Sequence, residues 1–235
     1  MASLGSGLLG LAFSTITSNY PANVPWSKNL TNVPSKSIMT TLFEQKQLPH
    51  KFTLAVSRGE TNSSDGGTFT IGGLPDLRDP RVNATNDFAS AALVATADFL
   101  TTTIAWYAIT VEGLYYGTFG NMSINSTAGN YIVDSGSPAI VLPASDTERW
   151  MSMFDPPMPF NSKTLEVNCN ATIPILEFRI GGKLFPMNPI DLVSRNSDGT
   201  CSSTVQAGSG PLYWLGDRFQ RNVLAVYDWE NEQMQ

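Results

Sequence analysis

Hydrophobic and polar residues alternate along much of this chain at the spacing of short β-strands. Phe52 to Val56 alternates in this way, a loop rich in Gly and Ser follows, and Thr68 to Gly73 returns with strand character, so the two segments predict a hairpin. Other runs combine aromatic and β-branched residues, which favour strands. On these grounds strands are also expected at residues 91–95, 105–111, 131–133, 165–167, 176–180, 184–186 and 223–228.

Helical patterning is rarer. Apolar residues recur at helical spacing from Ile38 to Phe43, which predicts an amphipathic helix within residues 35–47, and a short helix is expected at 145–154. Residues 76–87 are rich in Pro, Asp, Arg and Asn, the composition of a linker. Many short strands with regular turns and few helices indicate a mainly β fold.

The composition excludes several classes of protein. With 235 residues, of which 42% are hydrophobic and 14% charged, the chain can bury a sizeable core and does not have the composition of a disordered protein. The net charge of −6 argues against a nucleic-acid partner, which needs a basic surface. No apolar run reaches the roughly 18 residues of a membrane span. Residues 1–17 are apolar but lack the basic region of a signal peptide.

One segment combines strand character with a carboxylate in a tight turn. Tyr131 to Val133 lead into Asp134, and Ser135, Gly136 and Ser137 follow. The turn places the acid at the end of a strand, among hydroxyls and backbone amides. A working carboxylate is held in this way, although an Asp that merely caps a β-turn has the same local sequence.

A second apolar run near the other end of the chain fits the first. Tyr213 to Leu215 end at Gly216, and Asp217 follows. A glycine at such a position lets another backbone segment pass close by. The hairpin described above closes on Phe-Thr-Ile-Gly-Gly at residues 69–73, and two cysteines lie at Cys169 and Cys201.

In this order, the motifs resemble the C-terminal lobe of the pepsin-like aspartic proteases, of the fungal type. Residues 7–13, Gly-Leu-Leu-Gly-Leu-Ala-Phe, are similar to the Leu-Gly strand of the family's N-terminal lobe. The resemblance implies a pepsin-like acid protease fold that comprises the C-terminal lobe, the interlobe segment and a remnant of the N-terminal lobe. Residues 1–78 would be the end of the N-terminal lobe and the interlobe segment, and residues 79–235 the C-terminal lobe.

The resemblance also assigns roles to individual positions. These are Asp134 as the second catalytic acid, Ser135, Gly136 and Ser137 as support for its turn, Leu9, Gly10, Leu215 and Gly216 as the threading strands, and Asp217 as a structural or pKa-modulating carboxylate. Pro138 departs from the Ser or Thr that the family commonly has there, so the turn loses a hydroxyl and an N–H donor.

No residue matches the family's first catalytic acid or its flap tyrosine. Peptide hydrolysis by carboxylates needs two acids that share one proton, so we expect this chain to be inactive by itself. The missing lobe and the missing signal peptide lead us to expect that the chain begins partway through a longer protein. The resemblance implies that the complete protein is an endopeptidase that cleaves peptides or unfolded proteins at acidic pH, without a metal or an organic cofactor.

Three alternatives stay open at this point. The chain can be a non-catalytic binding or inhibitory module derived from a protease, or a truncated gene product. A homodimer in which two copies of Asp134 form the pair is not expected, because the N-terminal remnant would have to be displaced. The lone His50 and the serines beside Asp134 do not suggest a serine-protease triad.

In the family, a disulfide lies where Cys169 and Cys201 occur, and an oxidising compartment is therefore expected. The alternative is two buried free thiols; two cysteines alone do not make a zinc site. The full-length protein is expected to be extracellular or in the secretory pathway or vacuole. Sequons for possible N-glycosylation begin at Asn29, Asn62, Asn83, Asn121, Asn125 and Asn170.

Overall fold

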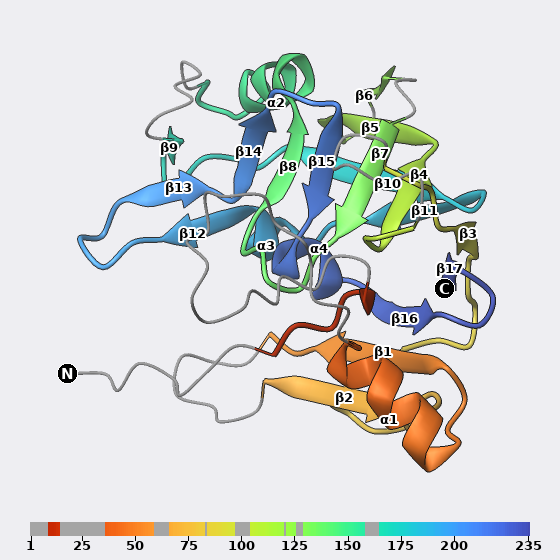
Figure 1. The fold of residues 1–235 in the computed structure, drawn as a ribbon. Helices are drawn as coiled ribbons and strands as arrows, with labels where there is room; N and C mark the ends of the chain where they lie inside the picture. Colours follow the sequence, from red (N-terminus) through yellow and green to blue (C-terminus); the bar gives the residue numbers. More distant parts are fainter. Residues whose placement is uncertain are drawn as a thin grey trace, which may run out of the picture.

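The computed structural model describes residues 9–14, 36–58, 66–82, 84–96, 104–119, 121–125, 129–157 and 165–235. Within these residues the chain forms four β-sheets and few, short helices (Figure 1). The predicted mainly β fold is confirmed. No helix among these residues is both long and apolar enough to cross a membrane.

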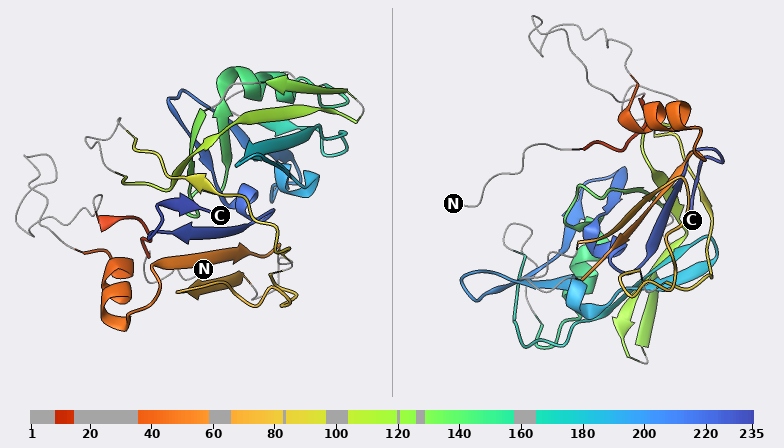
Figure 2. Two further views of the ribbon diagram at one scale, coloured as in Figure 1. Left: turned by 90° about the vertical axis from the view of Figure 1, so that its right-hand side faces the viewer. Right: turned by 90° about the horizontal axis from the view of Figure 1, so that it is seen from below.

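The first sheet brings together segments from both ends of the chain. Its strands lie in the order β2 (Gly67–Ile71), β1 (Lys51–Val56), β16 (Leu224–Asp228), β17 (Gln233–Met234) and β3 (Ala91–Ala92). β1 forms the predicted hairpin with β2 on one side and pairs antiparallel with β16 on the other. This sheet lies beneath the other sheets in Figure 1 and in the left view of Figure 2.

The second sheet carries the two sequence motifs. Its order is β14 (Val205–Gly208), β8 (Ile140–Pro143), β15 (Leu212–Leu215), β7 (Gly129–Val133) and β4 (Ala108–Val111). β15 runs parallel to β7 but antiparallel to β8. Because β7 and β15 are parallel and in register, the residues that follow them emerge side by side at one edge of the sheet.

Two smaller sheets complete the strands. One has the order β11 (Lys183–Pro186), β10 (Ile175–Ile180), β5 (Gly113–Thr118) and β6 (Asn121–Asn125), and the other has β12 (Val193–Arg195), β13 (Cys201–Ser203) and β9 (Glu166–Val167). The helices are α1 (Ile38–Lys46), α2 (Ala144–Met151), α3 (Pro189–Leu192) and α4 (Asp217–Gln220).

Helix α1 begins where the Ser37 side chain accepts a hydrogen bond from the Thr40 N–H, as an N-cap does. It ends at Gln47, which has a left-handed φ of 51°. Met39 and Phe43 form its buried face, as the helical spacing predicts.

An aromatic cluster joins the first sheet to the second. Phe52 of β1 stacks on Tyr227 of β16 with ring centroids 4.4 Å apart, and the Tyr107 ring meets Tyr227 edge-on at 4.6 Å. All three rings are buried. Tyr107 precedes β4, so this contact fixes the first sheet beneath the edge of the second.

Several strand predictions have to be corrected. The strand predicted for residues 105–111 is confined to Ala108–Val111, and that for 91–95 to Ala91–Ala92 with an isolated bridge at Leu93. The hairpin of β5 and β6 was not predicted at all. In β5 both faces are mostly buried, so its sequence lacks the alternation of a half-exposed strand.

The strand predicted for residues 7–13 is wrong for its described part. Residues 9–14 pair with no strand; instead the Tyr107 hydroxyl donates to the Leu11 carbonyl at 2.5 Å, and Phe13 stacks on Trp229 at 4.6 Å. The Trp229 Nε1–H donates to the Tyr107 hydroxyl at 2.6 Å. Side-chain packing, rather than a β-ladder, therefore holds this segment.

Cys169 and Cys201 form a disulfide across a separation of 32 residues. In the chain-entropy model a loop of this length contributes about 3–4 kcal/mol to stability, as an upper figure.

We predict that the double variant Cys169→Ser, Cys201→Ser loses up to this free energy of unfolding, measured by urea denaturation. The wild-type protein under reducing conditions is the matched control and should reproduce the loss; unchanged midpoints in both would contradict it.

Asp228 at the end of β16 links stability to pH. Burial acts to raise the pKa of Asp228, but hydrogen bonds from Asn231 and Gln233 and the charge of Lys51 outweigh it, so the pKa lies below its ordinary value. The ionised carboxylate therefore stabilises the fold above its unfolded pKa of about 3.9. This contribution is lost as the pH falls through the folded pKa.

We therefore predict that Asp228→Asn lowers the free energy of unfolding at neutral pH. The difference in this free energy between the variant and the wild type, here called the gap, should narrow as the pH falls through the folded pKa of Asp228. Urea denaturation at a series of pH values measures this. Glu230→Gln, at a nearby exposed position, is the control and should show a much smaller gap at neutral pH. A gap for Asp228→Asn that widened in acid would refute the prediction.

Candidate active site

Asp134 lies directly after β7, where the parallel pairing with β15 positions its backbone. Val133 is in register with Leu215, and the Asp134 N–H donates to the Leu215 carbonyl at 3.1 Å. On the other side, the Val133 N–H donates to the Tyr107 carbonyl at 2.9 Å. The carboxylate is thus carried by a strand end that is tied to both of its neighbours.

The turn after Asp134 closes on its own backbone. The Gly136 N–H donates to the Asp134 Oδ1 at 2.9 Å, and the Ser137 N–H donates to the Asp134 carbonyl at 3.2 Å. Asp134 is half-buried, whereas Ser135 and Gly136 are exposed. These bonds use the N–H groups of residues 136 and 137, so Pro138 leaves them intact.

The chain that leaves this turn crosses Gly216 at very short range. The Gly216 N–H donates to the Ala139 carbonyl at 3.0 Å, and the Asp217 N–H donates to the Ser137 carbonyl at 2.7 Å. A Cβ atom at Gly216 would lie 2.3 Å from the Ala139 oxygen and 2.4 Å from the Ser137 oxygen. No side chain fits in that space, so the close backbone passage expected at Gly216 is present.

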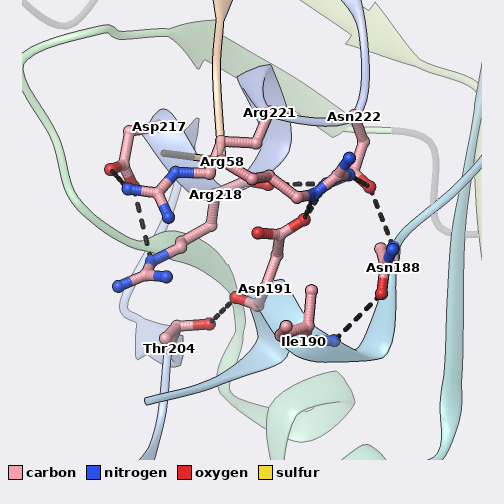
Figure 3. A network of polar contacts seen from close by, with 9 residues as sticks. All are labelled: Arg58, Asn188, Ile190, Asp191, Thr204, Asp217, Arg218, Arg221 and Asn222. Atoms are coloured by element: carbon pink, nitrogen blue, oxygen red, sulfur yellow. Dashed lines mark hydrogen bonds and ion pairs between the residues drawn. The ribbon is translucent and has the colours of Figure 1, made fainter. Parts of the chain in front are cut away.

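Asp217 faces guanidinium groups (Figure 3). Its Oδ2 lies 3.0 Å from the Arg221 Nη2, and its Oδ1 lies 3.6 Å from the Arg218 Nε. The carboxylate of Asp134, in contrast, accepts a backbone N–H within its own turn. The two acids therefore have different partners, which fits the structural role predicted for Asp217.

A buried polar chain behind the Asp134 turn was not predicted. The Tyr227 hydroxyl donates to the Gln220 Oε1 at 3.0 Å, and the Gln220 Nε2 makes a long contact of 3.5 Å to the Leu215 carbonyl, which also accepts the Asp134 N–H. Burial raises the pKa of Tyr227, and the negative charge of Asp134 raises it further. Tyr227 therefore stays protonated and available as a donor.

A second unpredicted group is the buried Asp191, whose side chain is 2% exposed (Figure 3). Its Oδ2 accepts hydrogen bonds from the Arg58 Nε at 2.8 Å and the Asn222 Nδ2 at 3.0 Å. Its carbonyl accepts from the Thr204 hydroxyl at 2.7 Å. Since Arg58 follows β1, this ion pair links the first sheet to α3 and to the loop after α4. Each partner is distant in sequence, so no local signal marked the pair.

The other predicted positions are distributed away from this turn. Leu9 is 56% exposed, and a Cβ atom at Gly10 would meet nothing within 4 Å, so the threading role of these two residues stays a prediction.

Asn170 is exposed. Asn29, Asn62 and Asn83 lie outside the described residues, as do the side chains of Asn121 and Asn125. Among the described residues, no three His, Cys, Asp or Glu side chains gather in a way that could hold a metal ion.

The contact at Gly216 predicts a large effect of a single methyl group. We expect Gly216→Ala to force the crossing backbones apart and to lower the free energy of unfolding by about 1–3 kcal/mol or more. Gly73→Ala is the matched control, because a Cβ atom there meets nothing within 4 Å. Thermal and urea denaturation of both variants measure the difference. Equal stability of the two variants would show that the crossing is loose in solution.

Comparison with known proteins agrees with this geometry. The family model of the eukaryotic aspartyl proteases matches residues 1–235. The chain is 30% identical to a probable aspartic-type endopeptidase of Aspergillus fumigatus, over 95% of this chain and 51% of that protein. It is 24% identical to rhizopuspepsin-2 of Rhizopus niveus, over 97% of this chain and 51% of that protein. The chain thus spans about half the length of these relatives. It belongs to the eukaryotic aspartyl protease family.

Proposed function

We propose that this chain supplies one half of the catalytic centre of an aspartic-type endopeptidase, with Asp134 as the catalytic carboxylate. The observation that carries the proposal is the position of Asp134. Asp134 is half-buried and directly follows β7, which runs parallel to β15. Its Oδ1 accepts a hydrogen bond from the Gly136 N–H at 2.9 Å. A carboxylate that is oriented but still accessible can exchange a proton with a water molecule or a substrate.

The proposed chemistry needs a second carboxylate next to Asp134. Two like charges about 3 Å apart repel by roughly 5 kcal/mol at an effective dielectric constant of 20, so the pair keeps one proton. The ionised acid then takes a proton from a water molecule as it attacks the peptide carbonyl. The protonated acid donates its proton to the carbonyl oxygen. Asp217 does not fit the role of this partner, because its carboxylate is engaged with Arg218 and Arg221.

The buried groups behind the turn support this role. Leu215 accepts the Asp134 N–H through its carbonyl, and Gln220 and Tyr227 extend the same chain of contacts into the core. A rigid support limits the motion of the carboxylate, which is what positioning of a general acid or base requires. We assign Gln220 and Tyr227 as positioning residues, because neither contacts the carboxylate directly.

The remaining features follow from the same proposal. Residues 1–78 would end the N-terminal lobe and form the interlobe segment, and residues 79–235 would form the C-terminal lobe. The substrates would be peptides or unfolded proteins, cleaved at acidic pH. The disulfide between Cys169 and Cys201 suits an oxidising compartment, so we place the full-length protein outside the cell or in the vacuole. There, Asn170 would be accessible to glycosylation.

The decisive test begins with the transcript upstream of Met1. We expect an open reading frame that encodes a second acidic loop, and we expect cleavage of an unfolded protein at acidic pH by the extended protein but not by the present chain. Asp134→Ala should lower kcat of the extended protein by roughly 10²- to 10⁴-fold or more. The control is Asp198→Ala, which removes an exposed carboxylate in the turn between β12 and β13 and should leave kcat unchanged.

Three results would contradict the proposal. Full activity of the extended Asp134→Ala protein would exclude this carboxylate from catalysis. Cleavage by the present chain, abolished by Asp134→Ala and dependent on a dimer in solution, would assign the pair to two copies of Asp134. A stop codon close upstream of Met1, together with an inactive chain, would favour a non-catalytic binding module or a truncated gene product.

A further inference from the structure

Tyr107 contacts both the N-terminal part of the described chain and the strand that carries Asp134. Its hydroxyl donates to the Leu11 carbonyl at 2.5 Å, and its own carbonyl accepts the Val133 N–H at 2.9 Å. The residue is 6% exposed, so its ring lies in the core. One buried residue thus connects a distant segment of the chain to the position just before Asp134.

Residues 11–14, here called the strap, are attached to the core at three points (drawn in red in Figure 1). Leu11 accepts the Tyr107 hydroxyl through its carbonyl. The Phe13 ring lies 5.1 Å from the Tyr107 ring. The Ser14 Oγ accepts a backbone N–H at the start of α1 at 2.9 Å. Two of the three points involve Tyr107, which is therefore the main anchor of the strap.

The Tyr107 hydroxyl forms two hydrogen bonds at once. It donates to the Leu11 carbonyl and accepts the Trp229 Nε1–H at 2.6 Å. Burial raises the pKa of Tyr107, so the hydroxyl keeps the proton that it donates. Phe13 stacks on the same Trp229 at 4.6 Å. Loss of this one hydroxyl would therefore leave two polar groups without their partner at the point where the strap is bound.

The Tyr107 carbonyl lies one residue outside β4, at the end of a ladder. β4 pairs with β7 so that Ala108 is opposite Ile132. The bond from the Val133 N–H to the Tyr107 carbonyl is the next one along, and it is the last before Asp134. A residue at the end of a ladder has a paired neighbour on one side only, so its side-chain packing determines how firmly its carbonyl is held.

Three aromatic rings surround the side chain of Tyr107. Tyr227 meets it edge-on at 4.6 Å, Phe52 at 5.8 Å and Phe13 at 5.1 Å. The first two rings belong to β16 and β1 and are buried. Phe13 belongs to the strap, so a strap that left its place would remove one of the three rings and the acceptor of the hydroxyl together.

A second series of contacts leads from Tyr107 to the same turn. The Tyr227 ring packs on Tyr107, and its hydroxyl donates to Gln220. Gln220 contacts the Leu215 carbonyl, which accepts the Asp134 N–H. The N–H of Asp134 and that of the preceding residue point to opposite neighbours of β7. Both neighbours are in turn supported by the Tyr107 ring, one directly and one through Tyr227.

We propose that Tyr107 is a positioning residue for Asp134, and that it keeps the Asp134 turn in place only while the strap is bound to it. When the strap leaves, the Tyr107 side chain loses contacts and the end of the ladder at Val133 loosens. A molecule with a displaced strap would keep its fold but hold the Asp134 carboxylate in several orientations. This inference rests on the proposed function only in treating Asp134 as the catalytic carboxylate.

The first experiment removes the hydroxyl alone. Tyr107→Phe keeps the ring but loses both hydrogen bonds, so we expect the Asp134 N–H to exchange with solvent about tenfold faster, measured by NMR on the present chain. The proton shift of the Gly136 N–H, which reports its hydrogen bond to the Asp134 Oδ1, should change as well. Tyr116→Phe is the matched control, because it also removes a buried hydroxyl, which donates to Asp146 at 3.1 Å. It should leave both signals unchanged.

The second experiment displaces the strap and leaves Tyr107 intact. Phe13→Ala removes a ring of the strap and should raise the exchange rate of the Asp134 N–H by a similar factor. Phe69→Ala is the control, because its ring meets Phe52 at 5.7 Å, at the β2 side of the same aromatic cluster, and should have a much smaller effect. In the double variant Phe13→Ala, Tyr107→Phe, the increase should be smaller than the product of the two single increases, because both act through the same contact.

Several outcomes would overturn the proposal. Unchanged Asp134 exchange in Tyr107→Phe would remove Tyr107 as a positioning residue. A faster exchange in Tyr107→Phe but not in Phe13→Ala would refute the coupling to the strap, and equal changes in Tyr116→Phe would reveal a general loosening instead. If Phe13→Ala does not fold, Phe13→Leu, which loses the stacking but stays apolar, takes its place.

These measurements do not involve catalysis. Full activity of an extended Asp134→Ala protein would overturn the proposed function but would leave the exchange rates as they are. Unchanged exchange rates would overturn the coupling between the strap and the turn but would leave the proposed function as it is. The two failures are therefore distinguishable.

Discussion

The candidate active site depends on one close contact between two backbone segments, at Gly216. The segment that leaves the Asp134 turn passes Gly216 at a distance that excludes even a methyl group, and its carbonyls at Ser137 and Ala139 accept hydrogen bonds from the N–H groups of Asp217 and Gly216. The contact locks the end of β15 to the start of β8. Because β7 and β15 are parallel neighbours, the same contact also determines where Asp134 can lie. Orientation of the carboxylate is thus a property of the crossing rather than of the turn alone.

Buried polar groups extend the hydrogen-bond contacts of the Asp134 turn into the core. The Leu215 carbonyl receives the Asp134 N–H and also the longer contact from Gln220, which in turn accepts a bond from Tyr227. Buried polar groups are costly unless they are paired, so each member favours a single arrangement of the others. The buried ion pair of Asp191 with Arg58 likewise favours a single arrangement of the first sheet relative to α3.

The first sheet joins segments that are far apart in the sequence. β1 and β16 come from opposite ends of the chain, and the rings of Phe52, Tyr107 and Tyr227 pack where this sheet meets the second one. Through Tyr227 of β16, whose hydroxyl donates to Gln220, this sheet also reaches the base of the candidate active site.

The sequence by itself determined the features that depend on neighbours along the chain. The mainly β class, the turn after Asp134 and the need for a glycine at position 216 follow from local pattern and backbone freedom. The roles of Gln220 and Asp191 required the tertiary structure, because their partners lie far away in sequence and a polar residue carries no local sign of what will bury it. The segment at residues 9–13 shows the same limit. A strand needs a neighbour to pair with, and here aromatic packing took that place.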